Sequence, residues 1–540
     1  MATEPRRNAD DFVRSTPYAD IPSNPDELTP MPTPSVLPPS GRAGHKTCPR
    51  AEPLTGLVVA AALAASIVLV FTGCSTPVVH PSVDMPAQFA ASTAAADVEP
   101  EAAWWESFHD PVLTDLIGRA ARENRDVKIA AARLRAAHSG ETISRSWLFP
   151  SVGLSAFGMD RSSGYDAAKK QGFPDPKIAL GSVDVSWELD ISGRLRAGAS
   201  AAAADALAAE DGVRGVRLLV MSDVASNYFT LVGAQRQIET LRAISAAQDE
   251  TLRLVTARHR AGLATPFDVE RAQTEAATAH AQIPPLETLA AVSRHRIAVL
   301  IGDQAFNAAA IVTSRGDAVV PEARPGQPAT LLQRRPDVLA LMAQVDAANA
   351  RRQQAAAEWF PRLFLGASFG RQGVELNGID LGAARFTNVA GLLLMPLFNA
   401  GRTQAINEVA ESSQREALLR AEDGIVRALE DVENSLVTLA QERHRAESLQ
   451  SAAGSAEAAL GRAQSLYDRG QIDLLPLLDA QRARLTARFS ANDSSTRLQL
   501  DSVQLYKALG GGWQVFEPTA KTANSATAQP SAAGAARPQS

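Results

Sequence analysis

Two very long stretches of the chain carry apolar residues at spacings of three and four. Val224 and Tyr228 follow this spacing within residues 194–260, and Val432 follows it within residues 402–469. Such positions fall on one face of a helix that packs lengthwise against another helix, as in a coiled coil. Each stretch therefore predicts one continuous helix about 100 Å long.

Four shorter stretches alternate apolar and polar residues instead. In residues 182–190, Val183, Val185, Trp187 and Leu189 alternate with Asp184, Ser186, Glu188 and Asp190, and weaker alternation occurs in residues 152–159, 363–369 and 389–398. An apolar face opposite a charged face is typical of strands in a membrane barrel, with lipid outside and water inside. In the three weaker stretches, a one-sided soluble sheet would give the same pattern.

Four strands are too few to close a barrel in lipid. Membrane barrels leave no open edge and need roughly eight strands or more. If these strands span a membrane, several chains must share one barrel, with eight strands from two chains or twelve from three. An eight-stranded barrel is filled by its own side chains, so conduction favours three chains or more.

Shorter helices are predicted between these elements, over residues 111–147, 265–300, 331–359 and 476–508. Asp110 and Pro111 fit a helix N-cap followed by proline in the first turn. Trp104, Trp105 and Phe108 precede this cap, and we expect the three aromatic side chains to pack against neighbouring helices rather than to stack a ligand.

The glycine turn that ends each long helix occurs twice, 208 residues apart, at Gly262 and Gly470. The same offset separates Gly193 from Gly401, which precede the two long helices. We predict a two-fold internal repeat in which each glycine turn is the tip of a helical hairpin. The repeats cover residues 104–302 and 331–517, and a Gly- and Pro-rich linker over residues 303–330 joins them.

The N-terminal region has the features of a secretory signal. Residues 54–73 form an apolar run that follows basic residues and ends in small residues before Cys74. A membrane-spanning anchor, which needs about 20 apolar residues, is the alternative. Residues 1–53 are Pro-rich and are either disordered or the product of too early a start codon, and residues 74–103 form a linker. The tail over residues 518–540 is predicted to be disordered.

Composition and charge narrow the function classes. The formal net charge of −6 leaves no basic footprint for a nucleic-acid partner. The chain has no HExxH, no G-x-S-x-G, no Walker A pattern and no Cys/His cluster with zinc spacing. We therefore predict a protein that is not an enzyme and has no metal site. A structural periplasmic coiled-coil lipoprotein remains an alternative, although it would not need the alternation in residues 182–190.

In combination these features resemble the TolC superfamily of outer-membrane efflux proteins, and in particular its NodT-type lipoprotein branch. The resemblance rests on Cys74, on Trp104-Trp105-Glu106-Ser107-Phe108-His109-Asp110-Pro111, on Arg335-Pro336-Asp337-Val338, on Asn399-Ala400-Gly401-Arg402 and on both tip turns. Cys74 is similar to the lipid-acceptor cysteine of that branch, although Phe71 replaces the usual leucine. The resemblance implies a covalent N-acyl and diacylglycerol lipid on Cys74 and no other cofactor.

The resemblance implies a mixed α/β membrane protein that works as a homotrimer. Its twelve strands form a β-barrel in outer-membrane lipid, and its helical hairpins form an α-barrel tunnel across the periplasm. The inner end meets a periplasmic adaptor protein and an inner-membrane pump of the resistance-nodulation-division type. The implied function is a passive conduit that exports small molecules such as drugs, toxic compounds or metals. The outer-membrane duct of a type I protein secretion system is the alternative.

The resemblance also implies a gate at the tips. Asp268 matches an aspartate that bonds a tyrosine in the family, and Tyr467 matches that tyrosine. Asp479 matches an aspartate that rings the constriction. Other roles stay open at this point, since Asp268 and Asp473 also fit helix N-caps and Asp479 also fits a solvated helix face.

Two substitutions in the second tip predict a less charged gate than that of the best-known member. Ile472 stands where that member has an arginine, and Pro476 replaces a second aspartate. We expect Leu474 or Leu475 to narrow the passage. The turn residues expected to contact the adaptor are Gly262, Thr265, Gly470 and Asp473.

Overall fold

The computed structural model describes residues 76–91, 101–170, 172, 175–303, 305, 313, 320–322 and 325–517. The predictions for residues 1–53, for the signal segment 54–73, for Cys74 and for the tail 518–540 lie outside the described residues. The main elements are α2 (Pro111–Glu123), α3 (Arg125–Ser146), β1 (Ser151–Asp160), β2 (Pro176–Leu189), α5 (Arg194–Arg260), α6 (Pro266–Ala281), α7 (Ile283–Leu300), α8 (Leu331–Arg334), α9 (Pro336–Ala356), β3 (Arg362–Leu376), β4 (Ile379–Leu394), α10 (Arg402–Asp468) and α11 (Leu474–Ala508).

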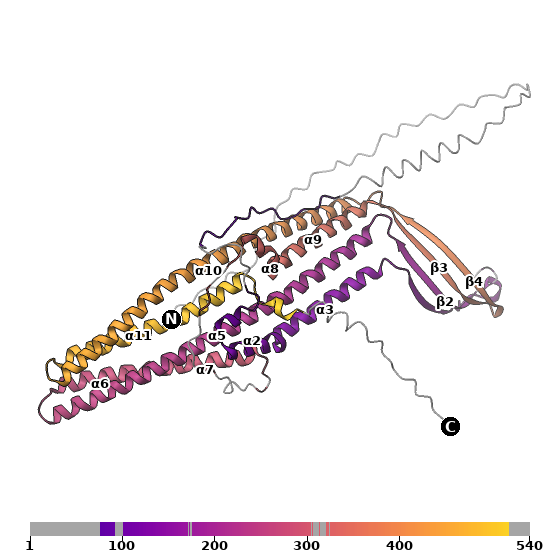
Figure 1. Cartoon of the computed structure of the whole chain (residues 1–540). Coiled ribbons are helices and arrows are strands. Elements are labelled where there is room, and N and C mark those ends of the chain that lie inside the picture. The colour runs from indigo at the N-terminus through magenta and orange to yellow at the C-terminus, as the bar shows by residue number, and fades with distance from the viewer. Residues whose placement is uncertain are drawn as a thin grey trace, which may run out of the picture. The chain divides into compact units, whose positions relative to one another are not determined.

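The two long helices are confirmed. α5 and α10 each contain 67 residues, and each begins after a glycine with positive φ, Gly193 at 78° and Gly401 at 83°. In Figure 1 the strands lie together at one end of these helices, and the turns that lead into α6 and α11 lie at the other end. α5 packs against α3, α6, α7, α9 and α11, and α10 packs against α9 and α11.

The predicted helices over 111–147, 265–300 and 331–359 are wrong as continuous helices, because each is broken once. Asn124 ends α2 and caps α3, since its Oδ1 accepts from the backbone N–H groups of Asp126 and Val127. Gln282 separates α6 from α7, whose first turn contains Pro284 and Pro285. Proline has no N–H to continue a helix. Arg335 separates α8 from α9, because the residue before a proline, here Pro336, favours an extended backbone.

The four strands form one antiparallel sheet in the order β1-β2-β3-β4. Every strand begins earlier or ends later than predicted, and β4 stops at Leu394, so residues 395–398 are not part of it. The missed parts of β2, β3 and β4 contain many glycines and alanines and little alternation. Asn377 (φ 51°) and Gly378 (φ 83°) form the two-residue turn between β3 and β4.

The register gives the sheet two different faces, as alternation predicts. On one face, Leu154, Val183 and Phe369 form a row of cross-strand neighbours. The next row on that face contains Val152, Val185, Ala367 and Val389. The opposite face carries Ser155, Ser182, Asp184, Ser368 and Asn388. Within the described sheet, β1 and β4 each pair on one side only, so two strand edges are left open.

The largest core cluster lies midway along α5 and confirms that the aromatic motif packs rather than binds. Trp104 is fully buried and stacks on Tyr506 with 5.4 Å between ring centroids. Asp110 caps α2 as predicted, accepting from Val112 N–H at 2.9 Å, and its other oxygen accepts from the Tyr228 hydroxyl at 2.6 Å. Among the described helices, none is both long and apolar enough to cross a bilayer.

Candidate functional site

The same backbone turn closes both helical tips. After α5, Leu263 N–H donates to Arg258 O and Gly262 N–H donates to His259 O, both at 2.9 Å. After α10, the matching bonds run from Gln471 N–H to Leu466 O and from Gly470 N–H to Tyr467 O, again at 2.9 Å. This pair of bonds defines the Schellman motif, which needs a residue of positive φ. Gly262 and Gly470 supply it with φ values of 76° and 70°.

Asp268 forms a capping box with Thr265 at the start of α6. The carboxylate accepts from Thr265 N–H at 2.9 Å and from its hydroxyl at 2.8 Å, and Asp268 N–H donates to Thr265 Oγ1 at 3.2 Å. Thr265 is therefore the N-cap, and Asp268 stands three residues later. The bonds from Thr265 lower the pKa of Asp268 below its usual value. Because the folded-state pKa is the lower one, this stabilisation is present at neutral pH and is lost as the pH falls through that value.

Tyr467 lies under a cation at the end of α10. The Arg258 guanidinium carbon is 4.4 Å from the centre of the Tyr467 ring. Tyr467 is only 6% exposed. The ring packs in an apolar cluster with Val255, Leu477 and Leu478. The sequence pattern places Arg258 in the first tip stretch, but its contact with Tyr467 was not predicted. Within the described chain, Asp268 bonds to Thr265 and not to the Tyr467 hydroxyl.

The remaining tip residues are divided between core and surface. Leu474 is 8% exposed and belongs to the same cluster as Tyr467, whereas Leu475 is 46% exposed. Of these two leucines, only Leu475 is therefore exposed at the tip. Asp473 occupies the N-cap position of α11 but makes no side-chain capping bond there. Asp479 is exposed, 3.8 Å from Arg482.

A strap over residues 76–91 ties the start of the described chain to α9 and α10. Val79 exchanges two hydrogen bonds with the Asn349 side chain, at 3.1 and 2.9 Å, and the N–H groups of Ala90 and Ala91 donate to the Glu433 carboxylate at 2.7 and 3.0 Å. Thr76 at the other end of the strap lines a hollow of about 430 Å³ together with Gly193 and Phe360. That hollow lies where the helices meet the strands.

The comparisons with known proteins agree with this architecture. A family profile described as "Outer membrane efflux protein" matches residues 116–303 and 328–511, more than half of the chain. The chain belongs to the outer membrane efflux protein family. It is therefore the outer-membrane channel component of a tripartite efflux system, as predicted, and the family is one of channels rather than enzymes.

Relatives of this efflux channel span nearly its full described length. The pyoverdine export outer membrane protein OpmQ of Pseudomonas putida is 31% identical over 462 residues, which are 83% of this chain and 96% of OpmQ. The probable outer membrane lipoprotein SilC of Salmonella typhimurium is 25% identical over 84% of this chain and 98% of SilC. The solved structure of the outer-membrane channel OprN superposes with a TM-score of 0.73 at 29% identity, covering 82% of this chain and 99% of OprN.

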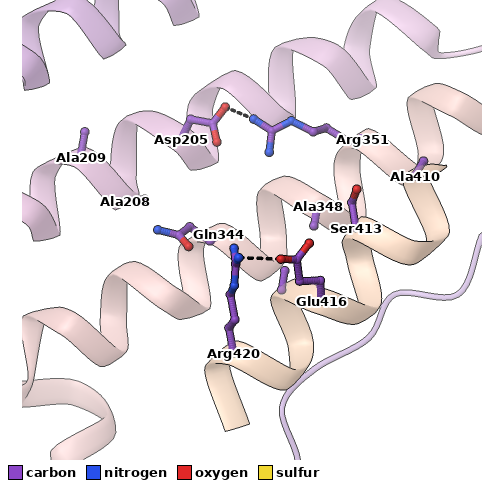
Figure 2. Close-up of a pocket in the computed structure, with 11 residues that line it drawn as sticks. Asp205, Ala208, Ala209, Gln344, Ala348, Arg351, Ala410, Ser413, Glu416 and Arg420 are labelled. Carbon is purple, nitrogen blue, oxygen red and sulfur yellow. Dashed lines mark hydrogen bonds and ion pairs between the residues drawn. The ribbon is translucent and has the colours of Figure 1, made fainter. Parts of the chain in front are cut away.

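A hollow between α5, α9 and α10 of the efflux channel is shown in Figure 2. Its volume is about 540 Å³, and five alanines line it. Asp205 points to Arg351 and pairs with it, and Glu416 pairs with Arg420 at 2.5 Å. The charged groups at the rim are thus paired with one another. We interpret the hollow as a packing gap left by small side chains, not as a site for cargo.

Proposed function

We propose that three copies of this chain form one passive conduit, with a twelve-stranded barrel in the outer membrane and an α-barrel tunnel below it. The observation that carries the proposal is the sheet, which has one apolar face, one polar face and two open edges. An open edge in lipid leaves backbone groups unpaired. Pairing of β4 with β1 of the next chain satisfies both edges, and three chains leave a lumen wide enough to conduct.

The two-fold repeat in this proposal is supported by matched glycines. The offset of 208 residues relates Gly262 to Gly470, and it also relates Gly302 (φ 70°) to Gly510 (φ 71°). Both of the latter glycines pack directly on backbone. A Cβ at Gly302 would lie 2.5 Å from Glu123 O, and one at Gly510 would lie 2.8 Å from Arg334 O. In the first half, the end of α7 thus packs on the break between α2 and α3. In the second half, the end of α11 packs on the break between α8 and α9.

The proposed partners are a periplasmic adaptor and an inner-membrane pump of the resistance-nodulation-division type. The first tip presents Leu263 and Phe267, which are 78% and 65% exposed. Such apolar side chains at the end of a long hairpin suit contact with an adaptor. Named relatives export pyoverdine, toluene and cations. We propose small molecules as the cargo of this channel, with the pump making the selection.

The proposed resting gate consists of Tyr467, Asp268, Leu475 and Asp479 at the tips. Tyr467 and Asp268 do not bond within the chain, so we propose that a hydroxyl-to-carboxylate bond, where it forms, joins neighbouring chains. One Asp479 in each of three chains would give a ring of carboxylates, an arrangement that favours cations.

Planar-bilayer conductance tests the proposed function. The purified protein should insert as trimers that open discrete pores, because only a closed multi-chain barrel satisfies the strand edges. A preparation that contains folded helices but opens no pores, and that shows no trimers after cross-linking, would instead favour a structural lipoprotein.

Lipidation of Cys74 is a separate expected result. Cys74→Ser should abolish incorporation of labelled palmitate but leave trimers intact, because the strap bonds to Asn349 and Glu433 remain. Palmitate labelling and cross-linking of membrane fractions check this. Label retained by Cys74→Ser would refute lipidation at this cysteine.

A further inference from the structure

Two arginines oppose each other on the apolar face of the sheet. Arg371 of β3 pairs in register with Arg385 of β4 and, on its other side, with Gly181 of β2. Phe369 lies two residues before Arg371 on the same face. The guanidinium groups therefore stand just beyond the apolar rows, on the face that the proposed barrel turns to lipid.

The charge of this pair is not neutralised by the described part of the chain. Both arginines are exposed, and neither makes an ion pair or hydrogen bond with another described side chain. The nearby Lys177, by contrast, pairs with Asp160 at 3.6 Å. Like charges directly opposite on adjacent strands destabilise a sheet. An anion held between the two arginines would remove that cost.

A hollow next to the pair can hold the body of such an anion. Its volume is about 560 Å³, and Arg371 stands at its border. Besides Arg371, the hollow is lined by Ala156, Gly158, Ala179, Gly181, Gly373 and Ala383, and by Phe157 and Leu180. Phe157 and Leu180 pair with each other at a register position whose side chains belong to the opposite face, so the side chains on the face of the hollow are no larger than a methyl group. A bulky ring system can therefore lie flat on the sheet while a phosphate on it reaches the arginines.

The height of the pair on the sheet matches a membrane boundary. At the helix end of the sheet Trp147, Phe149 and Trp359 are exposed, an aromatic belt typical of one membrane–water interface. Arg371 lies nine residues beyond Arg362, the first residue of β3, which is about 30 Å along the strand. A tilt of about 40° reduces this to about 23 Å, close to the apolar height of about 25 Å in membrane barrels.

We propose that Arg371 and Arg385, with the hollow beside them, bind the phosphate-bearing headgroup of an outer-leaflet glycolipid of the lipid A class. This inference rests on the proposed function, which places the far end of the strands at the outer leaflet. Arginine suits the ligand, since its planar fork donates two parallel bonds to a phosphate. The occupant is anionic because the pair is cationic, and it is a lipid because the pair borders the apolar band.

Native mass spectrometry of the detergent-purified trimer tests the assignment, with diphosphorylated lipid A as the probe. The double variant Arg371→Gln/Arg385→Gln should bind at least about tenfold less lipid A than the wild type, because two charge-assisted contacts are lost. Dephosphorylated lipid A should bind the wild type as weakly as diphosphorylated lipid A binds the variant. Lys177→Gln removes a charge from the same rim and should bind normally, since that lysine is paired with Asp160.

Equal binding by the wild type and the glutamine variant would overturn the inference, as would equal binding of dephosphorylated lipid A. Inorganic phosphate that displaces lipid A completely would indicate a free-anion site and would also overturn it. Arg371→Lys/Arg385→Lys keeps the charge but loses the planar fork, so it should bind lipid A more weakly than the wild type and more tightly than the glutamine variant. This variant keeps the test valid if the glutamine variant fails to fold. Conductance of the same wild-type preparation separates the two proposals: pores without a lipid A preference refute this inference alone, and a lack of pores refutes the proposed function.

Discussion

Tyr467→Ala should make the channel leak in its resting state. The Tyr467 ring is 6% exposed, packs with Val255 and Leu477, and carries the Arg258 guanidinium 4.4 Å above its centre. Removal of a buried aromatic ring costs about 3–5 kcal/mol. When only about 1.4 kcal/mol of this loss destabilises the closed tip relative to the open tip, the small fraction of open channels rises about tenfold. Closed-state conductance of single trimers in a planar bilayer measures the effect.

Three further substitutions separate the contributions at the tip. Tyr467→Phe keeps the ring under Arg258 and removes the hydroxyl, so a leak in this variant would show that the hydroxyl bonds across chains. Asp268→Ala should also raise the leak, but it destroys the capping box as well. Thr265→Ala breaks the same capping box and leaves the carboxylate in place. A leak in Asp268→Ala that is absent from Thr265→Ala assigns the carboxylate to the gate. Closed-state conductance unchanged in all of these variants would reject the gate.

Val389→Arg should prevent stable insertion, whereas Asn388→Arg, one residue away, should not. Val389 is 79% exposed and belongs to the apolar face, while Asn388 pairs with Ser368 on the polar face. An arginine facing lipid near the middle of the bilayer costs about 2–4 kcal/mol. Unfolding by urea from lipid vesicles measures the difference between the two variants. Val389→Leu, which keeps the apolar character, is the matched control.

The Asn388→Arg variant carries a second readout. Its arginine would enter the lumen of the proposed barrel, so the reversal potential in a salt gradient should shift toward anion selectivity. Equal stability of Val389→Arg and Asn388→Arg would mean that the two faces do not separate lipid from water. The assignment of these strands to a membrane barrel would then be wrong, and not only the proposed number of strands in that barrel.

The helical part of the fold was predictable because its signals are local. Gly193 and Gly401 mark the starts of α5 and α10, and Gly262 and Gly470 mark the turns at their far ends. The breaks at Asn124 and Gln282 were missed although signals existed. Asparagine is a preferred N-cap, and consecutive prolines follow Gln282. Both breaks were missed because the helical spacing of apolar residues continues across them.

The strands and the tip were harder to predict, for different reasons. The outer halves of the strands mix glycine and alanine with charged and apolar residues, so their alternation is weak, although the Asn377-Gly378 pair is a strong hairpin signal. The capping box of Asp268 was readable in the spacing of Thr265 and Asp268. The stacking of Arg258 on Tyr467 was not, because it joins residues 209 positions apart and depends on how α5 meets α10.

The two glycine turns at the tips have a consequence for how such channels diversify. Their closing hydrogen bonds run only between backbone atoms, so the turn places few demands on neighbouring side chains such as Leu263 and Gln471. Mutations there can accumulate without unfolding the hairpin, provided that Gly262 and Gly470 are kept. A gene duplicated in a genome could thus acquire new adaptor partners by drift at its tips, while its long helices remain unchanged.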